Sequence, residues 1–193
     1  MRLHSIYEEV GKRVVDMLAA GAALIIILPI VLVLAFLIKI FDPGPVIFRH
    51  TRVGRAGVRF DFYKLRTMPV GTKNVPSDQI GLLQLTSIGR FLRRTNLDEL
   101  PQLYLVFTGK MSLVGPRPSL VSQEELIRLR VENGALQCRP GLTGLAQVNS
   151  FNGMSVSEKA AFDGYYAKNI SFLMDIKIIL HTFMYLLKPP PIY

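Results

Sequence analysis

The chain has 193 residues, half of them hydrophobic, and its 23 Lys and Arg against 14 Asp and Glu give a formal charge of +9. That length suits a single domain with a substantial core, and the charge favours an anionic partner: nucleic acid, an acidic membrane surface or a phosphorylated substrate. A single cysteine, Cys138, excludes an intramolecular disulfide framework, and His4, His50 and His181 are too far apart in sequence to indicate a zinc site.

The first predicted element is a strongly apolar helix. From Met17 to Ile38 the chain has 22 consecutive residues without a charge. A helix of that length measures roughly 33 Å, about the thickness of the hydrocarbon core of a bilayer. A signal peptide would have a shorter apolar run and a small-residue cleavage site, whereas Lys39 follows here. A retained membrane element is therefore predicted.

Pro29 lies near the middle of this run and removes one helical hydrogen bond, so a kink or break is expected there. Two topologies follow. The helix crosses the bilayer once with a kink, which general physics favours, or it bends at Leu28-Pro29 and returns to the face from which it entered. Basic residues flank both ends, and the larger group after the run places the bulk of the chain on the cytoplasmic side.

A β-hairpin is predicted next. The β-rich runs 46–53 and 58–65 flank a short glycine-bearing turn, and residues 69–85 have the composition of a loop. Residues 88–94 predict a short amphipathic helix, which either exposes a basic face to solvent or lies in a membrane interface.

Helices dominate the rest of the chain. Asn96 is expected to cap a helix from Leu97 to Phe107 that tolerates Pro101 in its first turns. Capping boxes at 122–125 and 155–158 mark two later helices, and apolar residues at the helical period predict a last helix over 172–187. The fold class is therefore a helix-rich single α+β domain with one β-hairpin.

Asp98 and Glu99 are the candidate catalytic residues. Adjacent carboxylates on a helix point about 100° apart, so they can serve one site in different roles, and a helix N-terminus would favour their ionised forms. One could attack phosphorus while its neighbour holds a divalent metal, and Arg93 and Arg94 upstream could neutralise phosphate oxygens. The alternative is that both acids only stabilise the start of a helix.

Four further residues are candidates, each with a structural alternative. Arg117 lies in a proline-flanked turn, Lys64 near the end of the hairpin and Arg139 before a Pro-Gly turn, and any of them could simply face water. Asp175 falls on an apolar stretch, where an unpaired buried charge would be costly. It is expected to pair with a cation or to lie on a polar stripe beside Lys177.

A series of motifs runs in one order along nearly the whole chain, from about Lys12 to Leu187. Together they resemble the monotopic phosphoglycosyl transferases, in the small form that contains little beyond the catalytic domain. The resemblance rests on residues 12–16, 48–54, 62–68, 97–102, 111–118, 139–148 and 165–169.

The resemblance implies a re-entrant membrane helix in residues 1–41, broken at Pro29, and a catalytic domain in residues 42–193. Both ends of the helix would lie on the cytoplasmic face of the bacterial inner membrane, which reverses the general preference for a spanning helix. The family usually has Ser before this proline, and this chain has Leu28, which cannot bond a freed carbonyl as a serine hydroxyl could.

The resemblance also implies a reaction. Asp98 would attack the β-phosphate of a UDP-sugar and expel UMP, Glu99 would help to bind Mg²⁺, and undecaprenyl phosphate would then take the sugar phosphate from Asp98. This would be the first membrane step of glycoconjugate assembly, with downstream glycosyltransferases as further partners. The residues implied to contact substrate or phosphate are Arg93, Arg117, Lys64, Arg139 and Asp175.

Three rival functions are weaker. A non-catalytic membrane module could use its arginines to bind anionic lipid or a partner protein. A nucleic-acid binder is disfavoured because the aromatic residues mostly alternate into apolar faces rather than cluster with basic residues. A degenerate homologue is disfavoured by the intact Asp98-Glu99 pair. For a short member of the family we expect an N-acetylated or deoxyamino hexose as the sugar, with simple hexoses as the alternative.

Overall fold

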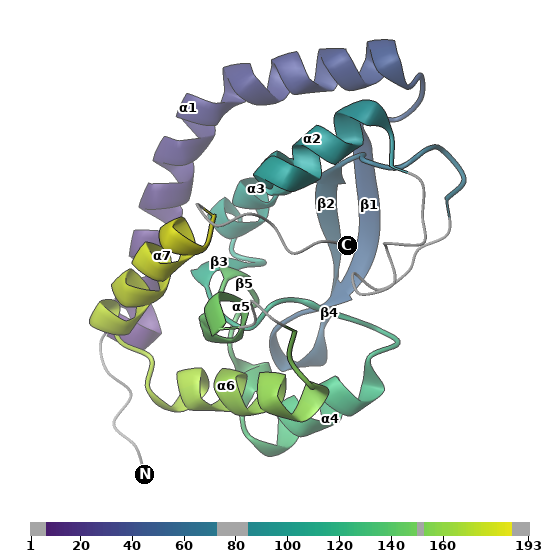
Figure 1. Ribbon diagram of the computed structural model, residues 1–193. Coiled ribbons are helices and arrows are strands. Elements are labelled where there is room, and N and C mark those ends of the chain that lie inside the picture. The colour runs from purple at the N-terminus through teal and green to yellow at the C-terminus, as the bar shows by residue number, and fades with distance from the viewer. Residues whose placement is uncertain (1–6, 73–84, 150–152, 187–193) are drawn as a thin grey trace.

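The structure is a computed structural model that describes residues 7–72, 85–149 and 153–186 (Figure 1). A short π-helix, Tyr7–Gly11, leads into the long helix α1, and three 3-10 turns lie at Arg55–Gly57, Leu97–Glu99 and Ala135–Gln137. The predicted helix-rich α+β class is confirmed. The elements are α1 (Lys12–Phe41), β1 (Ile47–Val53), β2 (Arg59–Leu65), α2 (Ser87–Thr95), α3 (Gln102–Phe107), β3 (Ser112–Val114), β4 (Ser119–Leu120), α4 (Glu124–Glu132), β5 (Gly141–Thr143), α5 (Leu145–Asn149), α6 (Val156–Lys168) and α7 (Phe172–Leu186).

The predicted hairpin is present and forms most of a three-stranded sheet. β1 and β2 pair antiparallel from Ile47 opposite Leu65 to Val53 opposite Arg59, and β4 adds to the other edge of β1. The turn between β1 and β2 needs positive φ at Gly57, where glycine has no steric cost. β3 and β5 form a separate parallel pair. The sheet thus brings β4 and the turn before it next to the hairpin.

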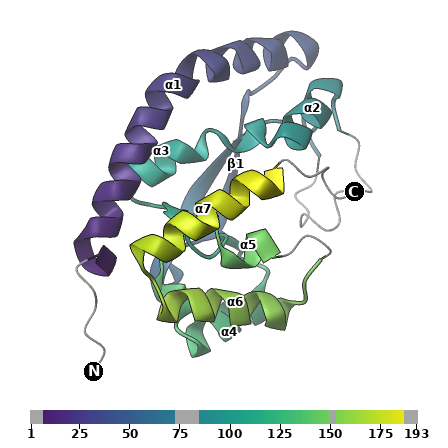
Figure 2. The same cartoon turned by 60° about the vertical axis from the view of Figure 1, so that its left-hand side comes forward.

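α1 packs against the domain along both of its halves. Helical structure continues through Pro29, and the ribbon bends about midway, so that the helix wraps around one side of the molecule (Figures 1 and 2). Ala20 in the first half is fully buried against α3, while Leu34 and Ile38 in the second half pack against Leu65 and Leu92. Burial of each of these Leu and Ile side chains contributes roughly 1.5–3 kcal/mol.

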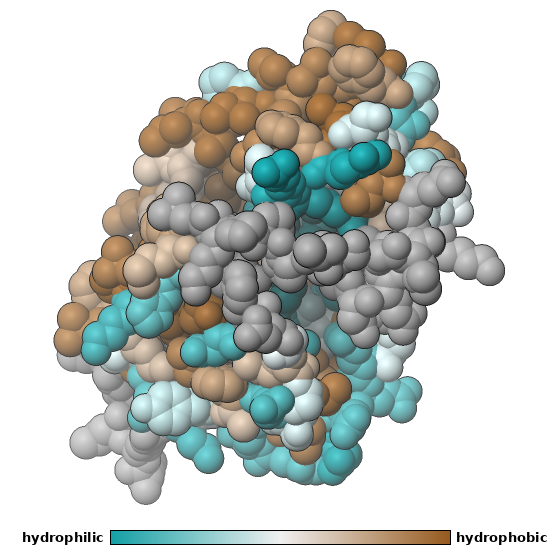
Figure 3. All heavy atoms as spheres, in the orientation of Figure 1, coloured by the Kyte–Doolittle hydropathy of each residue, from teal (hydrophilic) through white to brown (hydrophobic). Residues whose placement is uncertain are grey.

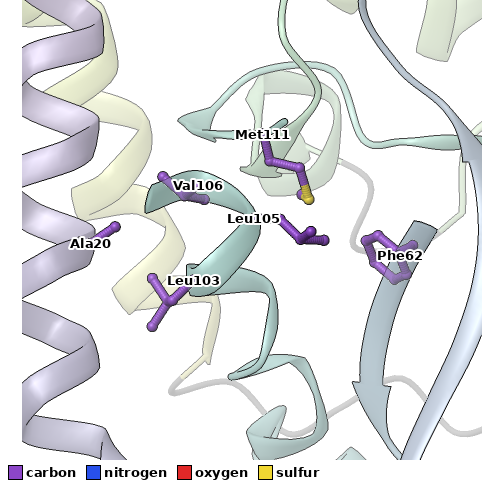
Figure 4. Packing of buried hydrophobic residues seen from close by; sticks show 6 residues of the cluster. All are labelled: Ala20, Phe62, Leu103, Leu105, Val106 and Met111. Atoms are coloured by element: carbon purple, nitrogen blue, oxygen red, sulfur yellow. The ribbon is translucent and has the colours of Figure 1, made fainter. Parts of the chain in front are cut away.

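The main core lies between α1, α3 and β2 (Figure 4). A third cluster, around Val114, Tyr166 and Ile178, joins β3 to α6 and α7. The first two clusters therefore pack the hairpin, α2 and α3 against α1. Because Asp98 lies between α2 and α3, this packing fixes the position of the segment that carries it. The main core consists of Ala20, Phe62, Leu103, Leu105, Val106 and Met111.

Helix starts agree with the sequence in part. At α6 the Ser155 hydroxyl accepts from the Glu158 N–H at 3.2 Å and the Glu158 carboxylate accepts from the Ser155 N–H at 2.9 Å, so that capping box is confirmed. The box predicted at Ser122 is wrong, because α4 begins after Gln123, whose side chain accepts from the Leu120 N–H instead. The predicted helices over 88–94 and 172–187 correspond to α2 and α7. Residue 187 and most of the predicted loop over 69–85 lie outside the described residues.

The outer surface of α1 is apolar (Figure 3). Leu18, Ile25, Ile26 and Phe36 are each more than 60 % exposed. Among the described residues, one helix, α1, is both long enough and apolar enough to cross a membrane. Only 11 % of its most apolar 18-residue stretch is buried in the protein. A core helix of a soluble domain would be mostly buried, so α1 has an apolar face left for another partner.

Candidate active site

The acid pair lies in a 3-10 turn between α2 and α3. α2 ends at Thr95, the next residue, Asn96, adopts a left-handed conformation with φ 55°, and α3 begins only after Pro101. The helix predicted over Leu97–Phe107 is thus confirmed only in its second half, as α3, while a 3-10 turn, Leu97–Glu99, takes the place of its first turn. The left-handed residue breaks the helical path, and Pro101 has no N–H with which to bond the preceding turn, so a single 3-10 turn fits between them. Asp98 and Glu99 thus project from a tight bend rather than from a helix start.

α2 is held close to the end of the hairpin, which places Arg93 near the acid pair. A side chain on Gly89 would collide with the Thr67 carbonyl, so only glycine lets the helix approach this closely. Thr86 caps the helix by accepting from the Gly89 N–H at 2.9 Å. Arg93 Nε donates to Thr67 Oγ1 at 2.9 Å, and its positive charge acts on Asp98.

Lys64 and Arg117 surround the two acids. Lys64 Nζ lies 2.5 Å from Glu99 Oε1 and 3.7 Å from Asp98 Oδ2. Arg117 donates to the same carboxylate, with Nη2 at 2.6 Å from Oε1 and Nη1 at 3.5 Å from Oε2. Gly115 lets the Arg117 turn lie flush against the backbone of Arg139, because a Cβ there would clash with it. Glu99 therefore holds both cations beside Asp98.

The two carboxyl groups are shifted in opposite directions. Burial raises the pKa of Asp98 above its usual range, and the charge of Lys64 only partly opposes this. Burial acts the same way on Glu99, but there the charges and hydrogen bonds of Arg117 and Lys64 outweigh it and hold the pKa well below its usual range. Adjacent acids thus have distinct electrostatic environments, as two different chemical roles require.

The residues present fit a magnesium ion that is shared with a phosphorylated substrate. Among the described residues no group of three or more His, Cys, Asp and Glu could hold a metal alone. Mg²⁺ is commonly bound by one or two carboxylates together with substrate phosphates, and needs no closed protein cage. The fully ionised carboxylate of Glu99, next to Asp98, is a donor of that kind.

Arg52 joins this site although the sequence analysis did not single it out. Its guanidinium carbon lies 5.4 Å from the centre of the Phe62 ring, and Lys64 Nζ lies 5.7 Å from the same ring centre. Burial and the neighbouring charge of Arg117 lower the pKa of Arg52 to about 10, so it stays charged at neutral pH. The strand register places Arg52 opposite Phe60, on the face shared by Phe62 and Lys64, and alternation along the hairpin could have revealed it.

Two predicted site residues lie in other clusters. The Asp175 carboxylate accepts from Tyr7 at 2.7 Å, from Lys12 at 2.6 Å and from Tyr166 at 2.8 Å, so it ties the start of α1 to α6 and α7. This pairing with a cation was one of the two expectations for Asp175.

A different set of charges acts on Arg139, and its backbone lies beside Gly115. Burial and the charges of Arg55 and Arg13 lower its pKa, while Asp16 opposes them. Of the residues predicted to contact phosphate, the structure thus brings Lys64, Arg93 and Arg117 to the acid pair. It places Asp175 against Lys12 of α1, and the charges that act on Arg139 are those of Arg55, Arg13 and Asp16.

The chain belongs to the bacterial sugar transferase family, which matches residues 7–189. This confirms the family resemblance drawn from the motifs. The chain is 40 % identical over 183 residues to the UDP-glucose:undecaprenyl-phosphate glucose-1-phosphate transferase of Caulobacter vibrioides, and the match covers 90 % of this chain and 68 % of that protein.

Two other relatives differ greatly in length. The protein of the same name in Escherichia coli K12 is 38 % identical over 187 residues, which cover 89 % of this chain but 39 % of that protein. The exopolysaccharide production protein PSS of Rhizobium leguminosarum bv. phaseoli is 38 % identical over 190 residues, which cover 89 % of this chain and 92 % of that protein. The chain thus spans about two fifths of one relative and nearly all of another.

Proposed function

We propose that this protein transfers a sugar 1-phosphate from a UDP-sugar to undecaprenyl phosphate, releases UMP, and passes through a covalent intermediate on Asp98. The observation that carries the proposal is the arrangement of Asp98. This carboxylate lies 3.7 Å from Lys64, and Lys64 and Arg117 are held in place by an ionised Glu99. Cations fixed beside a carboxylate suit in-line phosphoryl transfer, which depends on positioning and charge neutralisation.

The first step forms a bond between a carboxylate oxygen of Asp98 and the β-phosphorus of the donor. The bond from that phosphorus to the bridging oxygen breaks, and the electron pair leaves with UMP. In the second step a phosphate oxygen of undecaprenyl phosphate attacks the same phosphorus, and the bond to Asp98 breaks. The carboxylate is regenerated and the lipid carries a diphosphate-linked sugar. Lys64, Arg93 and Arg117 stabilise the charge on the phosphate oxygens throughout.

Glu99 would hold the magnesium ion together with the donor diphosphate. When bound, the ion supplies charge neutralisation at the phosphates. The role of Glu99 in this chain is then twofold: it remains ionised at all working pH values, and it orients Arg117 and Lys64 toward the neighbouring carboxylate.

Contacts at both ends of α1 support a re-entrant helix in a bacterial inner membrane. Near the start, Arg13 donates to the Val106 and Phe107 carbonyls at 2.7 and 2.6 Å. Near the end, Ile38 is fully buried in the second core and Arg66 binds Asp42. A helix that crosses the bilayer would carry its two ends to opposite faces, whereas here both ends contact the same domain. A bent helix with both ends on the cytoplasmic face, where undecaprenyl phosphate is taken up, reconciles these contacts.

The sugar donor is tested most directly with a panel that starts from UDP-glucose, since the Caulobacter and Escherichia coli relatives are named for glucose transfer. UDP-linked N-acetylated and deoxyamino hexoses complete the panel. Either result places the enzyme at the start of glycoconjugate assembly, upstream of further glycosyltransferases.

The deciding experiment is UMP release by the purified chain with Mg²⁺ and undecaprenyl phosphate, beside Asp98→Asn. We expect release with one donor, and a loss of about a thousandfold or more in the variant. Without the acceptor, intact-mass measurement should detect one sugar phosphate on the wild-type protein and none on Asp98→Asn. Asp61→Asn, a carboxylate paired with Arg49 on the exposed side of the hairpin, is the matched control. Release that survives in Asp98→Asn would exclude Asp98 as the nucleophile.

A further inference from the structure

A cavity of about 140 Å³ opens beside the acid pair. Arg117 lines it while pairing with Glu99, so the cavity and the acid pair share one cation. The other walls come from β1, β4, α4, α5 and α6, and none of the described lining residues belongs to the apolar helices α1 and α7. The cavity therefore shares Arg117 with the acid pair and lies among the elements away from α1 and α7.

Two residues of the wall also carry a buried polar atom without a hydrogen-bond partner within the described part of the chain. They are Ser119, through Oγ, and Arg52, through Nε. Buried polar groups in folded proteins are nearly always paired, so we expect a ligand in the cavity to contact these two residues. The amide side chains of Gln123 and Gln147 line the same space and add further polar groups.

The cavity has an excess of positive charge. Arg130 is neutralised by Asp163, with Nη2 at 2.6 Å from Oδ2, and its Nη1 donates to the Arg117 carbonyl at 2.9 Å. Arg130 thus fixes the Arg117 turn rather than attracting a ligand. Arg52 and Lys159 supply the remaining positive charge. The occupant should therefore be anionic at one end and rich in hydrogen-bonding groups.

We infer that this cavity binds the nucleoside monophosphate half of the donor, with its phosphate at Arg52 and Lys159 and its ribose or base against Ser119, Gln123 and Gln147. The inference rests on the proposed function and assigns the two halves of the donor to opposite sides of Arg117. Arg117 then lies where the phosphoanhydride bond breaks, between the leaving UMP and the sugar phosphate at Asp98. The lipid acceptor is a poorer occupant, because the apolar helices α1 and α7 contribute nothing to the described lining.

The test measures UMP binding to the 193-residue chain in detergent micelles by titration calorimetry. Ser119→Ala removes the unpaired hydroxyl, and Lys159→Met removes a rim charge with little change in volume. We expect each to weaken UMP binding by about tenfold. Lys168→Met, an exposed residue of α6 outside the cavity, should bind UMP as the wild type does. In turnover assays both cavity variants should raise the KM for the UDP-sugar and leave the KM for undecaprenyl phosphate unchanged.

The outcomes separate this inference from the proposed function. Unchanged UMP binding in both cavity variants, in a protein that turns over a UDP-sugar, would overturn the nucleotide site and leave the reaction standing. If the wild type binds UMP no more tightly than inorganic phosphate, and the cavity variants weaken the binding of both equally, the cavity is a general anion site. That result would also overturn the nucleotide site. A protein that binds UMP through Ser119 and Lys159 but uses no UDP-sugar would keep the nucleotide site and contradict the proposed reaction.

Discussion

At the scale of single residues, the raised pKa of Asp98 predicts how the reaction depends on pH. The proposed nucleophile, Asp98, must be ionised to attack, and burial moves its titration above the ordinary value of 3.8. The rate at which the covalent intermediate forms should therefore decrease as the pH is lowered. The decrease should begin at a higher pH than it would for an aspartate with an ordinary pKa. The pKa of Glu99 lies well below its usual range, so the titration of Glu99 does not contribute to the fall in rate over this pH range. The measurement is the single-turnover rate without undecaprenyl phosphate, recorded at a series of acidic pH values. A profile that stays flat down to the ordinary aspartate pKa would contradict it.

The same shift predicts that Asp98 costs stability. A carboxyl whose folded-state pKa is raised destabilises the folded protein when ionised, so the cost is present at neutral pH and disappears as the pH falls below that pKa. Asp98→Asn should therefore raise the melting temperature at pH 7 while abolishing turnover. At acid pH, where Asp98 is protonated, the two melting temperatures should converge. A variant that melts lower than the wild type at pH 7 would show that Asp98 stabilises the fold.

At the scale of elements, Pro29 predicts the topology of α1. Alanine at this position restores an N–H that can bond the Ile25 carbonyl and removes the steric clash of the ring, so it favours a straight helix. A cysteine placed at Val10, which is 59 % exposed, reports on the N-terminal end in a Cys138→Ser background. We expect it to be protected from a membrane-impermeant maleimide added on the periplasmic side, and to be labelled in part once Pro29→Ala is introduced. Periplasmic labelling with Pro29 intact would support a spanning helix.

The Asp175 cluster predicts a structural role at the junction of α1, α6 and α7. Lys12 and Asp175 have side chains only 12 % and 5 % exposed, and breaking a buried pair of this kind costs about 3–5 kcal/mol. Asp175→Asn should therefore lower the denaturation midpoint strongly. The KM for the UDP-sugar, measured below the new melting temperature, should stay unchanged. A rise in that KM without loss of stability would instead assign Asp175 to substrate binding, as the family resemblance implied.

Local patterns in the sequence predicted most helices and strands. The features that these patterns did not predict depend on contacts between residues far apart in the chain or on the backbone conformation of single residues. The alternation of the hairpin, the box at Ser155 and the apolar period of α7 all depend on neighbours within a few residues, and all are confirmed. The pairing of Lys12 with Asp175 joins residues 163 positions apart, which no local period encodes. The helix predicted over Leu97–Phe107 is confirmed as α3 only from Gln102, because Asn96 takes a left-handed conformation and its side chain makes no capping hydrogen bond.

At the scale of the whole molecule, the polar site and the apolar surface lie on different elements. Leu180 and Phe183 of α7 and Tyr104 of α3 are each more than half exposed, as is much of α1. The cation-lined cavity is bounded by α4, α5 and α6 instead. Figures 1 and 2 both place α4 on the far side of the molecule from the second half of α1. With α1 in the membrane, α3 and α7 should face lipid and α4 should face water.

This orientation can be measured because the chain has no tryptophan. Single reporters at Phe183→Trp and Tyr104→Trp should be quenched by brominated lipids in reconstituted bilayers, since both positions are expected within the interface. Val131→Trp on α4, 61 % exposed in the structure, is the matched control and should not be quenched. Quenching at Val131 equal to that at Phe183 would mean that the domain lies on its other side. The acid pair would then have to meet its lipid acceptor from a face without the apolar helices.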